Sequence, residues 1–369
     1  MGIARKPRDA RSETDSVLSR LGEVCRTRGL DALSERLAGL ATLVVPDIER
    51  VERELSVLGF RDDSVGRSAS HLVRLGGKRL RPLCVALAAR VPSDSGGVGV
   101  DETRVESGVL DLAVAVELVH NATLLHDDVV DLGDVRRGAP AARVVYGNAA
   151  SIFAGDWLLV EALRRVRSSG VTRVLDPLLA VIDEMIEAEA VQLEHRGTLD
   201  VDRATYFRVI EGKTASLFGW AAYAGGRAAG LGDQSCAALS TFGRKLGIAF
   251  QAVDDLLDVS GDARTTGKAL FADLREGKAT YPLLVAFERE PALRERARAL
   301  AAATEAGHDV DAACADVRAA MERTGAVAAC GELAHRSATD AMAALDVLPA
   351  CPARSALQTV AEATVHRLW

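Results

Sequence analysis

Aromatic residues and long apolar runs are scarce in this sequence. Phe, Tyr and Trp make up 4% of the 369 residues, and no period-two alternation of apolar residues persists, so β-strands are not expected. No apolar run is long enough to cross a membrane, and the charged N-terminus lacks the apolar core of a secretory signal. The composition, rich in Ala, Leu, Arg, Glu and Val, favours helix. We therefore expect an all-α protein in the cytoplasm.

Excess positive charge and paired cysteine motifs are also missing. Lys and Arg total 45 against 52 Asp and Glu, which gives a net charge of −7 and argues against nucleic acid as a partner. The cysteines show neither CxxC nor zinc-ligand spacing, so we expect buried thiols in a reducing compartment. They are Cys25, Cys84, Cys236, Cys314, Cys330 and Cys351.

No segment rich in Pro, Gly and Ser is long enough to separate two domains. The strongest candidate, PSDSGGVG at residues 92–99, is interpreted as a loop between helices. Residues 1–34 contain few large apolar side chains and are predicted to form a poorly ordered extension. One large helical domain is expected over residues 35–369, and it begins with an amphipathic helix from Glu35 to Leu58.

The segment HNATLLHDDVVDLGDVRRG, residues 120–138, places three aspartates at the end of an apolar stretch of helix length. In a helix, Asp127 and Asp131 are i and i+4, so both carboxylates lie on one face, where like charges repel. Mg²⁺ takes oxygen ligands and usually joins one or two carboxylates to substrate phosphates. A solvated acidic helix end is the simpler interpretation of one such cluster.

A second cluster makes a surface location hard to sustain. QAVDDLLD, residues 251–258, repeats the spacing with Asp254, Asp255 and Asp258 and again follows an apolar run. Two such clusters on apolar helices could face each other across a cavity and share metal ions.

The segment GGKRLRP, residues 76–82, combines two glycines with three cations just before a predicted helix. A helix N-terminus carries free N–H groups and a partial positive charge, to which Lys78, Arg79 and Arg81 add full charges. The segment is therefore either an anion site or a basic surface turn.

The motifs DDVVD followed by RRG, DDLLD and GGKRLRP have an order and approximate spacing that resemble the trans-isoprenyl diphosphate synthases, the polyprenyl synthetase family. The resemblance runs from about Glu35 to the C-terminus, and HNATLLHDDVVD is most similar to octaprenyl-type synthases. It implies a homodimer in which each chain is a single large helical bundle of the isoprenoid synthase type with a central active-site cavity. It also implies about three Mg²⁺ ions, with Mn²⁺ as a substitute, and condensation of isopentenyl diphosphate with an allylic diphosphate.

The resemblance also assigns roles to individual residues. The catalytic residues are expected to be Asp127, Asp131, Lys213 and Asp254. The metal ligands are expected to be Asp127, Asp128, Asp131, Asp254, Asp255 and Asp258. Isopentenyl diphosphate is expected at Lys78, Arg79, Arg81, His120 and Arg137. The allylic diphosphate is expected at Arg136, Lys213, Thr214, Gln251 and Lys268.

Four positions add to these assignments or qualify them. A lone histidine on an apolar helix is more often a core residue, so the role of His120 rests on the resemblance. Glu189 and Gln192 match family positions that line the cavity. The family often has two aspartates before its LxEGK stretch, but here Ala272 stands in the first position, so the contacts of this loop are expected to differ.

The charges of this site suggest a reaction by ionisation. Loss of diphosphate from the allylic substrate leaves a carbocation, and the double bond of isopentenyl diphosphate attacks its C1. The released diphosphate takes the proton, so no side-chain base is required. An apolar cavity keeps water away from the cation.

The length of the product follows from the residues that precede Asp127. Side chains at i−4, i−8 and i−11 form a stripe leading away from the metals. These are Thr123, Val119 and Val116, with Ala122 beside them. In short-chain members a bulky aromatic at the place of Ala122 or Thr123 closes the pocket, and none is present here, so a medium-to-long product is expected. Trp157, Trp220 or Tyr223 could still close the cavity from another helix.

Several alternatives stay open. A geranylgeranyl or farnesyl diphosphate synthase would share every motif and differ only in the pocket. A class I terpene cyclase also uses one DDxxD cluster and Mg²⁺, but it needs no basic GGKRLRP segment and usually lacks a second DDxxD. A non-catalytic partner subunit would have no physical need to keep both aspartate clusters. A helical protein with acidic patches on its surface would not account for the two clusters and the basic segment together.

Overall fold

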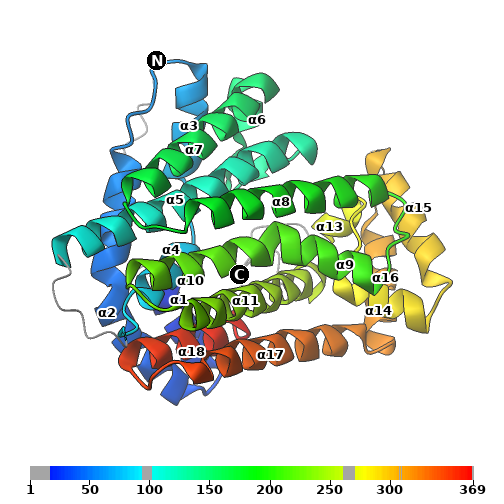
Figure 1. The fold of residues 1–369 in the computed structure, drawn as a ribbon. Helices are drawn as coiled ribbons and strands as arrows, with labels where there is room; N and C mark the ends of the chain where they lie inside the picture. The colour runs from blue at the N-terminus through cyan, green and yellow to red at the C-terminus, as the bar shows by residue number, and fades with distance from the viewer. Residues whose placement is uncertain (1–16, 94–101, 261–270, 307, 309, 368–369) are drawn as a thin grey trace, which may run out of the picture.

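The computed structural model describes residues 17–93, 102–260, 271–306, 308 and 310–367. These residues are almost entirely helical, which confirms the all-α expectation. The central helices are α5 (Glu102–Val130), α8 (Leu175–His195), α10 (Ser216–Ala228) and α11 (Asp233–Ser260). Figure 1 shows α8, α10 and α11 side by side in that order, and α5 also packs on α10.

Shorter helices surround this centre. The helices α2 (Asp31–Ser56), α4 (Leu80–Ala88) and α18 (Pro352–Thr364) pack on one another, and α4 also packs on α5 and α10. The outer side of α5 meets α7 (Asn148–Ser168), which packs on α3 (Ser64–Arg74) and α6 (Ala142–Tyr146). Along α11 lies α17 (Ala326–Ala344), followed by the short η2 (Leu345–Val347).

The remaining elements gather at one end of the bundle (Figure 1). They are α9 (Arg203–Ile210), α13 (Ala272–Arg275), α14 (Tyr281–Arg289), α15 (Leu293–Glu305) and α16 (Asp311–Arg323). Strands occur in the described residues only as β1 (Val135–Arg136) and β2 (Ala139–Pro140), an antiparallel pair directly after α5. The turn between them contains Arg137 and Gly138, both with positive φ.

A one-turn π-helix, η1 (Glu211–Ala215), separates α9 from α10. Such turns are frequent at functional sites because the extra residue changes the direction of the side chains around it. Two glycines of α11 let η1 and α10 approach closely. A Cβ on Gly247 would lie 2.5 Å from Cα of Ala215, and one on Gly243 would lie 2.2 Å from O of Phe218. The π-turn is therefore held against the helix that carries the second aspartate cluster.

The N-terminal expectation is wrong for the residues that the structure describes. Residues 17–27 form helix α1 (Val17–Thr27), and α2 already begins at Asp31. The side chains of Leu18, Leu21 and Cys25 are buried in the core against α2. Three apolar residues at helical spacing are sufficient for this packing, although the segment is polar overall. Residues 1–16 lie outside the described part of the chain.

The expectation about membrane-spanning length also needs correction. The segment Glu106–Val130 of α5 is long and apolar enough to cross a bilayer, but 67% of its most apolar window is buried inside the protein. Burial on every side explains why this helix is apolar all round. It is the core helix that carries the first aspartate cluster on its last turn.

Candidate active site

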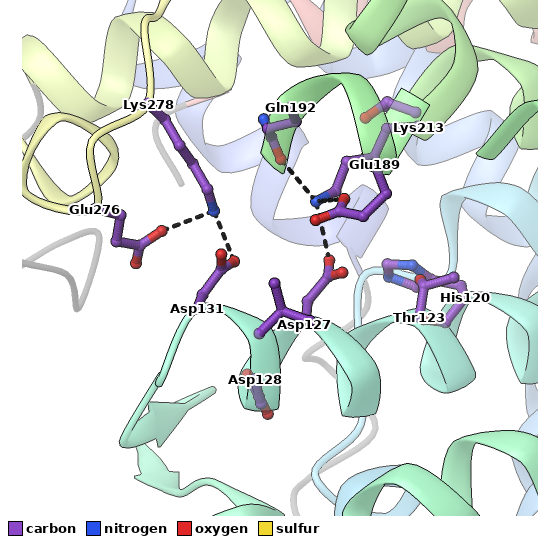
Figure 2. Close-up of polar contacts among 12 residues, drawn as sticks. His120, Thr123, Asp127, Asp128, Asp131, Glu189, Gln192, Lys213, Glu276 and Lys278 are labelled. Carbon is purple, nitrogen blue, oxygen red and sulfur yellow. Dashed lines mark hydrogen bonds and ion pairs between the residues drawn. The ribbon is translucent and has the colours of Figure 1, made fainter. Parts of the chain in front are cut away.

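The first aspartate cluster directs two of its three carboxylates toward a pair of lysines. Asp127, on the last turn of α5, and Asp131, the residue that follows this helix, point to the same side, as the i, i+4 spacing predicts (Figure 2). Nζ of Lys213 lies 3.5 Å from Oδ2 of Asp127, and Nζ of Lys278 lies 2.6 Å from Oδ2 of Asp131. Burial raises the pKa of Asp127, an effect that the nearby Lys213 opposes. The two carboxylates and the two ammonium groups form one charged surface.

Asp128 points away from this surface (Figure 2). Its side chain is fully buried and accepts hydrogen bonds from Nε and Nη2 of Arg136, at 2.8 and 2.5 Å. Adjacent residues of a helix are about 100° apart, so Asp128 cannot share the face of Asp127 and Asp131. Like Oδ2 of Asp258, Oδ2 of Asp128 is buried without a hydrogen-bond partner in the described structure, but it points away from Asp127 and Asp131, so the expected metal-ligand role does not fit Asp128. Its ion pair connects α5 to the β1–β2 turn and also occupies Arg136, which was expected at the allylic diphosphate.

The π-helix η1 connects the two aspartate helices. Lys213 donates to Oε2 of Glu189 at 2.5 Å and to Oε1 of Gln192 at 3.1 Å, so the two α8 residues line the site as expected (Figure 2). The next residue, Thr214, donates to Oε1 of Gln251 on α11 at 3.1 Å. Because Lys213 pairs with Asp127 near the end of α5 and the next residue of η1 bonds to Gln251 on α11, both aspartate clusters border the same space.

As in the first cluster, the middle aspartate of the second cluster is buried and bonded to other parts of the fold. Asp254 is partly exposed and pairs with Nη1 of Arg367 at 2.7 Å. Asp255 is buried and accepts hydrogen bonds from the Tyr206 hydroxyl (2.7 Å), the Tyr281 amide (2.9 Å) and the Gln251 side chain (3.0 Å). Burial raises the pKa of Asp255 to about 7. Its oxygens are already used, so it braces α11 against α9 and α14, and the expected ligand role does not fit it either.

Asp258 has the features of a cation ligand. Its Oδ2 is buried without a hydrogen-bond partner, and burial together with the charge of Asp273 raises the pKa of Asp258 to about 8. A buried carboxylate facing a second carboxylate is costly unless a cation lies nearby. Within the described residues, no three His, Cys, Asp or Glu side chains meet closely enough to hold a metal by themselves. This agrees with the chemistry of Mg²⁺, which is commonly completed by substrate phosphate and water.

Arg79 differs from the other cations of the GGKRLRP segment. It is 4% exposed, and its guanidinium pairs with Glu52 of α2 at 2.7 Å and with the buried Glu117 of α5. Burial opposes the charge, but Glu117 and Glu52 outweigh it and raise the pKa of Arg79. The expected contact with isopentenyl diphosphate does not fit Arg79, because two carboxylates already occupy its donors. Its place in the fold is a link between α2, α5 and the start of α4.

Lys78 and Arg81 each lie against an aromatic ring. Nζ of Lys78 is 5.4 Å from the ring centre of Phe250, and Cζ of Arg81 is 4.4 Å from that of Phe218. Burial lowers the pKa of Arg81 to about 10, and its Nε has no hydrogen-bond partner in the described structure. An aromatic face attracts a cation, so the rings of Phe250 and Phe218 help to hold these two side chains.

His120 and Arg137 complete this basic group. A Cβ on Gly77 would lie 3.1 Å from Nη2 of Arg137, so the guanidinium rests against the glycine turn. Burial and the charges of Arg81 and Arg137 lower the pKa of His120 well below its usual value. The histidine is therefore neutral at pH 7 and acts as a hydrogen-bonding group. The side chains of Lys78, Arg81, His120 and Arg137 are of the types that suit the binding of an anion.

Two residues of the site escaped the sequence reasoning. Lys278, which pairs with Asp131 and with Glu276 at 2.8 Å, belongs to the LREGK stretch and could have been found from its position after the second cluster. Arg367 lies far from any motif, and only the fold brings it to Asp254. Lys268, expected at the allylic diphosphate, lies outside the described residues.

The residues expected to set product length are in place. Val116, Val119 and Ala122 are buried on α5, and Thr123 donates to O of His120 at 2.9 Å. The three alternative blocking residues have other contacts. Trp157 packs on Phe60, with ring centres 5.6 Å apart. Trp220 and Tyr223 hydrogen-bond to the carbonyls of Val174 and Arg173, at the end of α8 opposite Gln192.

Comparison with known proteins identifies the family of the chain. The polyprenyl synthetase family model matches residues 62–317. The chain is 35% identical to octaprenyl diphosphate synthase of Escherichia coli over 90% of this chain and 96% of that protein. It is 33% identical to nonaprenyl diphosphate synthase of Mycobacterium tuberculosis, over 89% and 95% of the two chains.

Solved structures give the same result. The polyprenyl synthase of Caulobacter crescentus, complexed with calcium and isoprenyl diphosphate, superposes with a TM-score of 0.79 at 36% identity, covering 89% of this chain and 97% of that one. The fold is the all-α isoprenoid synthase fold, as the sequence predicts. Enzymes of this kind depend on Mg²⁺. The chain therefore belongs to the polyprenyl synthetase family, the trans-polyprenyl diphosphate synthases.

Proposed function

We propose that the protein condenses isopentenyl diphosphate with an allylic diphosphate, in trans, to make a medium-to-long polyprenyl diphosphate and release diphosphate. The observation that carries this proposal is the presence of two anion-binding groups beside one another. One combines Asp127 and Asp131 with Lys213 and Lys278, and the other is the basic group around Arg81. Two substrates that each carry a diphosphate require two such groups.

The allylic diphosphate fits the first group. Lys213, Thr214, Gln251 and Lys278 hold its oxygens, and the carboxylates of Asp127, Asp131, Asp254 and Asp258 supply the donors for about three Mg²⁺ ions, with Mn²⁺ as a substitute. These oxygen-only donors and the unpartnered Oδ2 of Asp258 suit a hard divalent cation. When bound, Mg²⁺ neutralises the charge that develops on the leaving diphosphate. In its absence Lys213 and Lys278 neutralise Asp127 and Asp131 instead.

Isopentenyl diphosphate fits the second group. Lys78, Arg81 and Arg137 bind its diphosphate, and neutral His120 donates or accepts one hydrogen bond. The phenyl rings of Phe218 and Phe250, 5.5 Å apart, support the two cations and keep this side of the site apolar. An apolar wall excludes water from the allylic cation. The departing diphosphate takes the final proton, so the chain needs no base of its own.

The product is proposed to be medium to long because no aromatic side chain stands at the positions of Ala122 and Thr123. The experiment is incubation of the protein with Mg²⁺, isopentenyl diphosphate and farnesyl diphosphate, followed by chromatography of the dephosphorylated products. A ladder ending at a long prenyl alcohol is expected. A product of four isoprene units or fewer would refute the chain-length argument. A cyclic hydrocarbon, or no consumption of isopentenyl diphosphate with any starter, would refute the synthase function.

The protein is also proposed to work as a cytoplasmic homodimer. Helices α7 and α8 pack on each other. Large apolar side chains are exposed on the outer faces of both helices. They are Ile152, Phe153, Val160, Leu179, Ile186 and Leu193. A second copy of the chain would cover such a surface.

Light scattering tests the dimer with a matched pair of variants. Ile186→Glu is expected to give a monomer, because Ile186 on α8 is 63% exposed, more than any other residue of this apolar set. Val347→Glu, at a similarly exposed residue of η2, is expected to remain dimeric. A monomeric wild type, or dissociation of both variants, would contradict this part of the proposal.

A further inference from the structure

Arg196, which follows the last residue of α8, contacts both the end of α5 and the turn that precedes Lys278. Arg196 donates from Nη1 to O of Val130 at 2.8 Å, on the last turn of α5, and from Nε to O of Glu276 at 3.1 Å. The same Nη1 lies 3.5 Å from Oδ1 of Asp131. A single guanidinium therefore bridges the helix that carries Asp131 and the turn that carries Lys278.

The backbone makes a second connection at the same place. The amide of Gly197 donates to O of Gly277 at 2.9 Å, and both glycines have φ near +76°. A Cβ on Gly277 would lie 2.7 Å from N of Gly197, which is closer than real Cβ atoms approach. The two glycines permit the contact that brings Arg196 between α5 and the turn. We call residues 196–197 and 276–277 the Arg196 clasp.

The Arg196 clasp determines where Lys278 lies relative to Asp131. Lys278 follows Gly277 directly, and its ammonium contacts Oδ2 of Asp131 at 2.6 Å. Arg196 faces the other oxygen of the same carboxylate. Two of its three contacts go to backbone carbonyls, which fixes the main chain on both sides of the Asp131–Lys278 pair.

We propose that Arg196 is a positioning residue for the allylic diphosphate: it acts through Asp131 and Lys278 and does not touch substrate itself. The inference rests on the proposed function, which takes Asp131 and Lys278 as binding groups for that substrate. Arginine suits the position because its planar fork donates in several fixed directions, whereas a lysine is a single point charge. Among the residues that the structure describes, Arg196 contacts none of those assigned to isopentenyl diphosphate, so loss of the clasp affects one substrate and spares the other.

The test compares Arg196→Ala with Arg298→Ala. Arg298 donates from Nε to O of Thr198 at 2.6 Å, so it binds the same turn without contacting Asp131. For Arg196→Ala, the KM for the allylic diphosphate is expected to rise about tenfold or more, since a hydrogen bond to a charged group is lost and the geometry loosens. The KM for isopentenyl diphosphate is expected to stay within about twofold. Arg196→Lys should recover part of the loss, and Arg298→Ala should match the wild type.

A second pair of variants tests the backbone connection between Gly197 and Gly277. Gly277→Ala places a Cβ against Gly197, and it is expected to give the same one-sided rise in KM. Gly230→Ala is the control, because Gly230 also has positive φ, +73°, but a Cβ there meets nothing within 4 Å. Equal changes in KM for both substrates, or a lower melting temperature with unchanged KM values, would show a merely structural role and overturn the inference.

A readout without turnover separates this inference from the proposed function. Mg²⁺ with inorganic diphosphate is expected to raise the melting temperature of the wild type and of Arg298→Ala, and to raise that of Arg196→Ala much less. An equal rise in all three would overturn the role of Arg196. A wild type that shows this rise but consumes no isopentenyl diphosphate would refute the proposed function and leave the role of Arg196 supported.

Discussion

Replacement of Arg79 by Met tests whether this arginine supports the fold or binds substrate. Its guanidinium pairs with Glu117, and both side chains are 3% exposed. The second partner, Glu52, is 45% exposed, so water can solvate it when the arginine is lost. Arg79→Met therefore removes the ion-pair partner of one buried carboxylate, that of Glu117, which keeps only the charges of Arg81 and Arg137 in its surroundings, while the apolar stem of the side chain is preserved.

Removing one partner of a buried ion pair costs about 3–5 kcal/mol. Unfolding entropy is roughly 2.1 cal/mol/K per residue, which for a chain of 369 residues means that 1 kcal/mol lowers the melting temperature by about 1.3 °C. We therefore expect Arg79→Met to melt about 4–6 °C below the wild type. The double variant Arg79→Met/Glu117→Gln is expected to recover part of this loss, because it removes the unpaired charge.

The assay combines thermal unfolding with steady-state kinetics, and Arg81→Met is the matched control. Arg81 lies on the Phe218 ring and makes no ion pair with a carboxylate in the described part of the chain, so its replacement should raise the KM for isopentenyl diphosphate strongly and keep the melting temperature. Arg79→Met should do the opposite. If Arg79→Met keeps its stability but loses affinity for isopentenyl diphosphate, the assignment of Arg79 to the fold is wrong.

Three further predictions concern the pocket, the allylic site and the metal-free protein. Ala122→Phe fills the buried stripe on α5 and is expected to shorten the product, read by chromatography; an unchanged product would place the pocket elsewhere. Lys278→Met is expected to raise the KM for the allylic diphosphate at least tenfold and to spare that for isopentenyl diphosphate; equal effects would argue against its assignment. The pKa values of Asp255 and Asp258 are raised to about 7 and about 8, so the folded protein binds more protons than the unfolded chain above about pH 4. Metal-free stability should therefore fall as the pH rises from about 4 to 8, less steeply in Asp258→Asn, and a flat melting profile would contradict this.

The family, the all-α fold and the main binding groups could be predicted from the sequence because the motifs are local. The i, i+4 spacing alone places Asp127 and Asp131 on one face. Adjacent residues of a helix point in different directions, so Asp128 does not share the face of Asp127 and Asp131, and Asp255 does not share the face of Asp254 and Asp258. A stricter use of helix geometry could have corrected these two assignments. The sequence shows which residue types the site contains, but the direction of each side chain has to be derived from helix geometry.

Contacts between distant segments could not be predicted. Nothing near GGKRLRP shows that Glu117, 38 residues from Arg79, neutralises it. The contact of Arg196 with Glu276 joins residues 80 positions apart, and it depends on a close approach of two glycines that only the fold reveals. The burial of α1 likewise depends on α2, which offers it an apolar face that the composition of residues 1–34 does not show.

The central claim is that one site has two separate groups of residues that bind diphosphate, one built from the aspartate helices and one from the basic turn. The measurement that tests it most directly is the incorporation of labelled isopentenyl diphosphate into an allylic starter by the wild type, Asp131→Asn and Arg81→Met, with each substrate and Mg²⁺ varied in turn. The account predicts that Asp131→Asn requires more Mg²⁺ and allylic diphosphate, while Arg81→Met requires more isopentenyl diphosphate alone. Identical changes in the two variants, or no incorporation by the wild type, would contradict it.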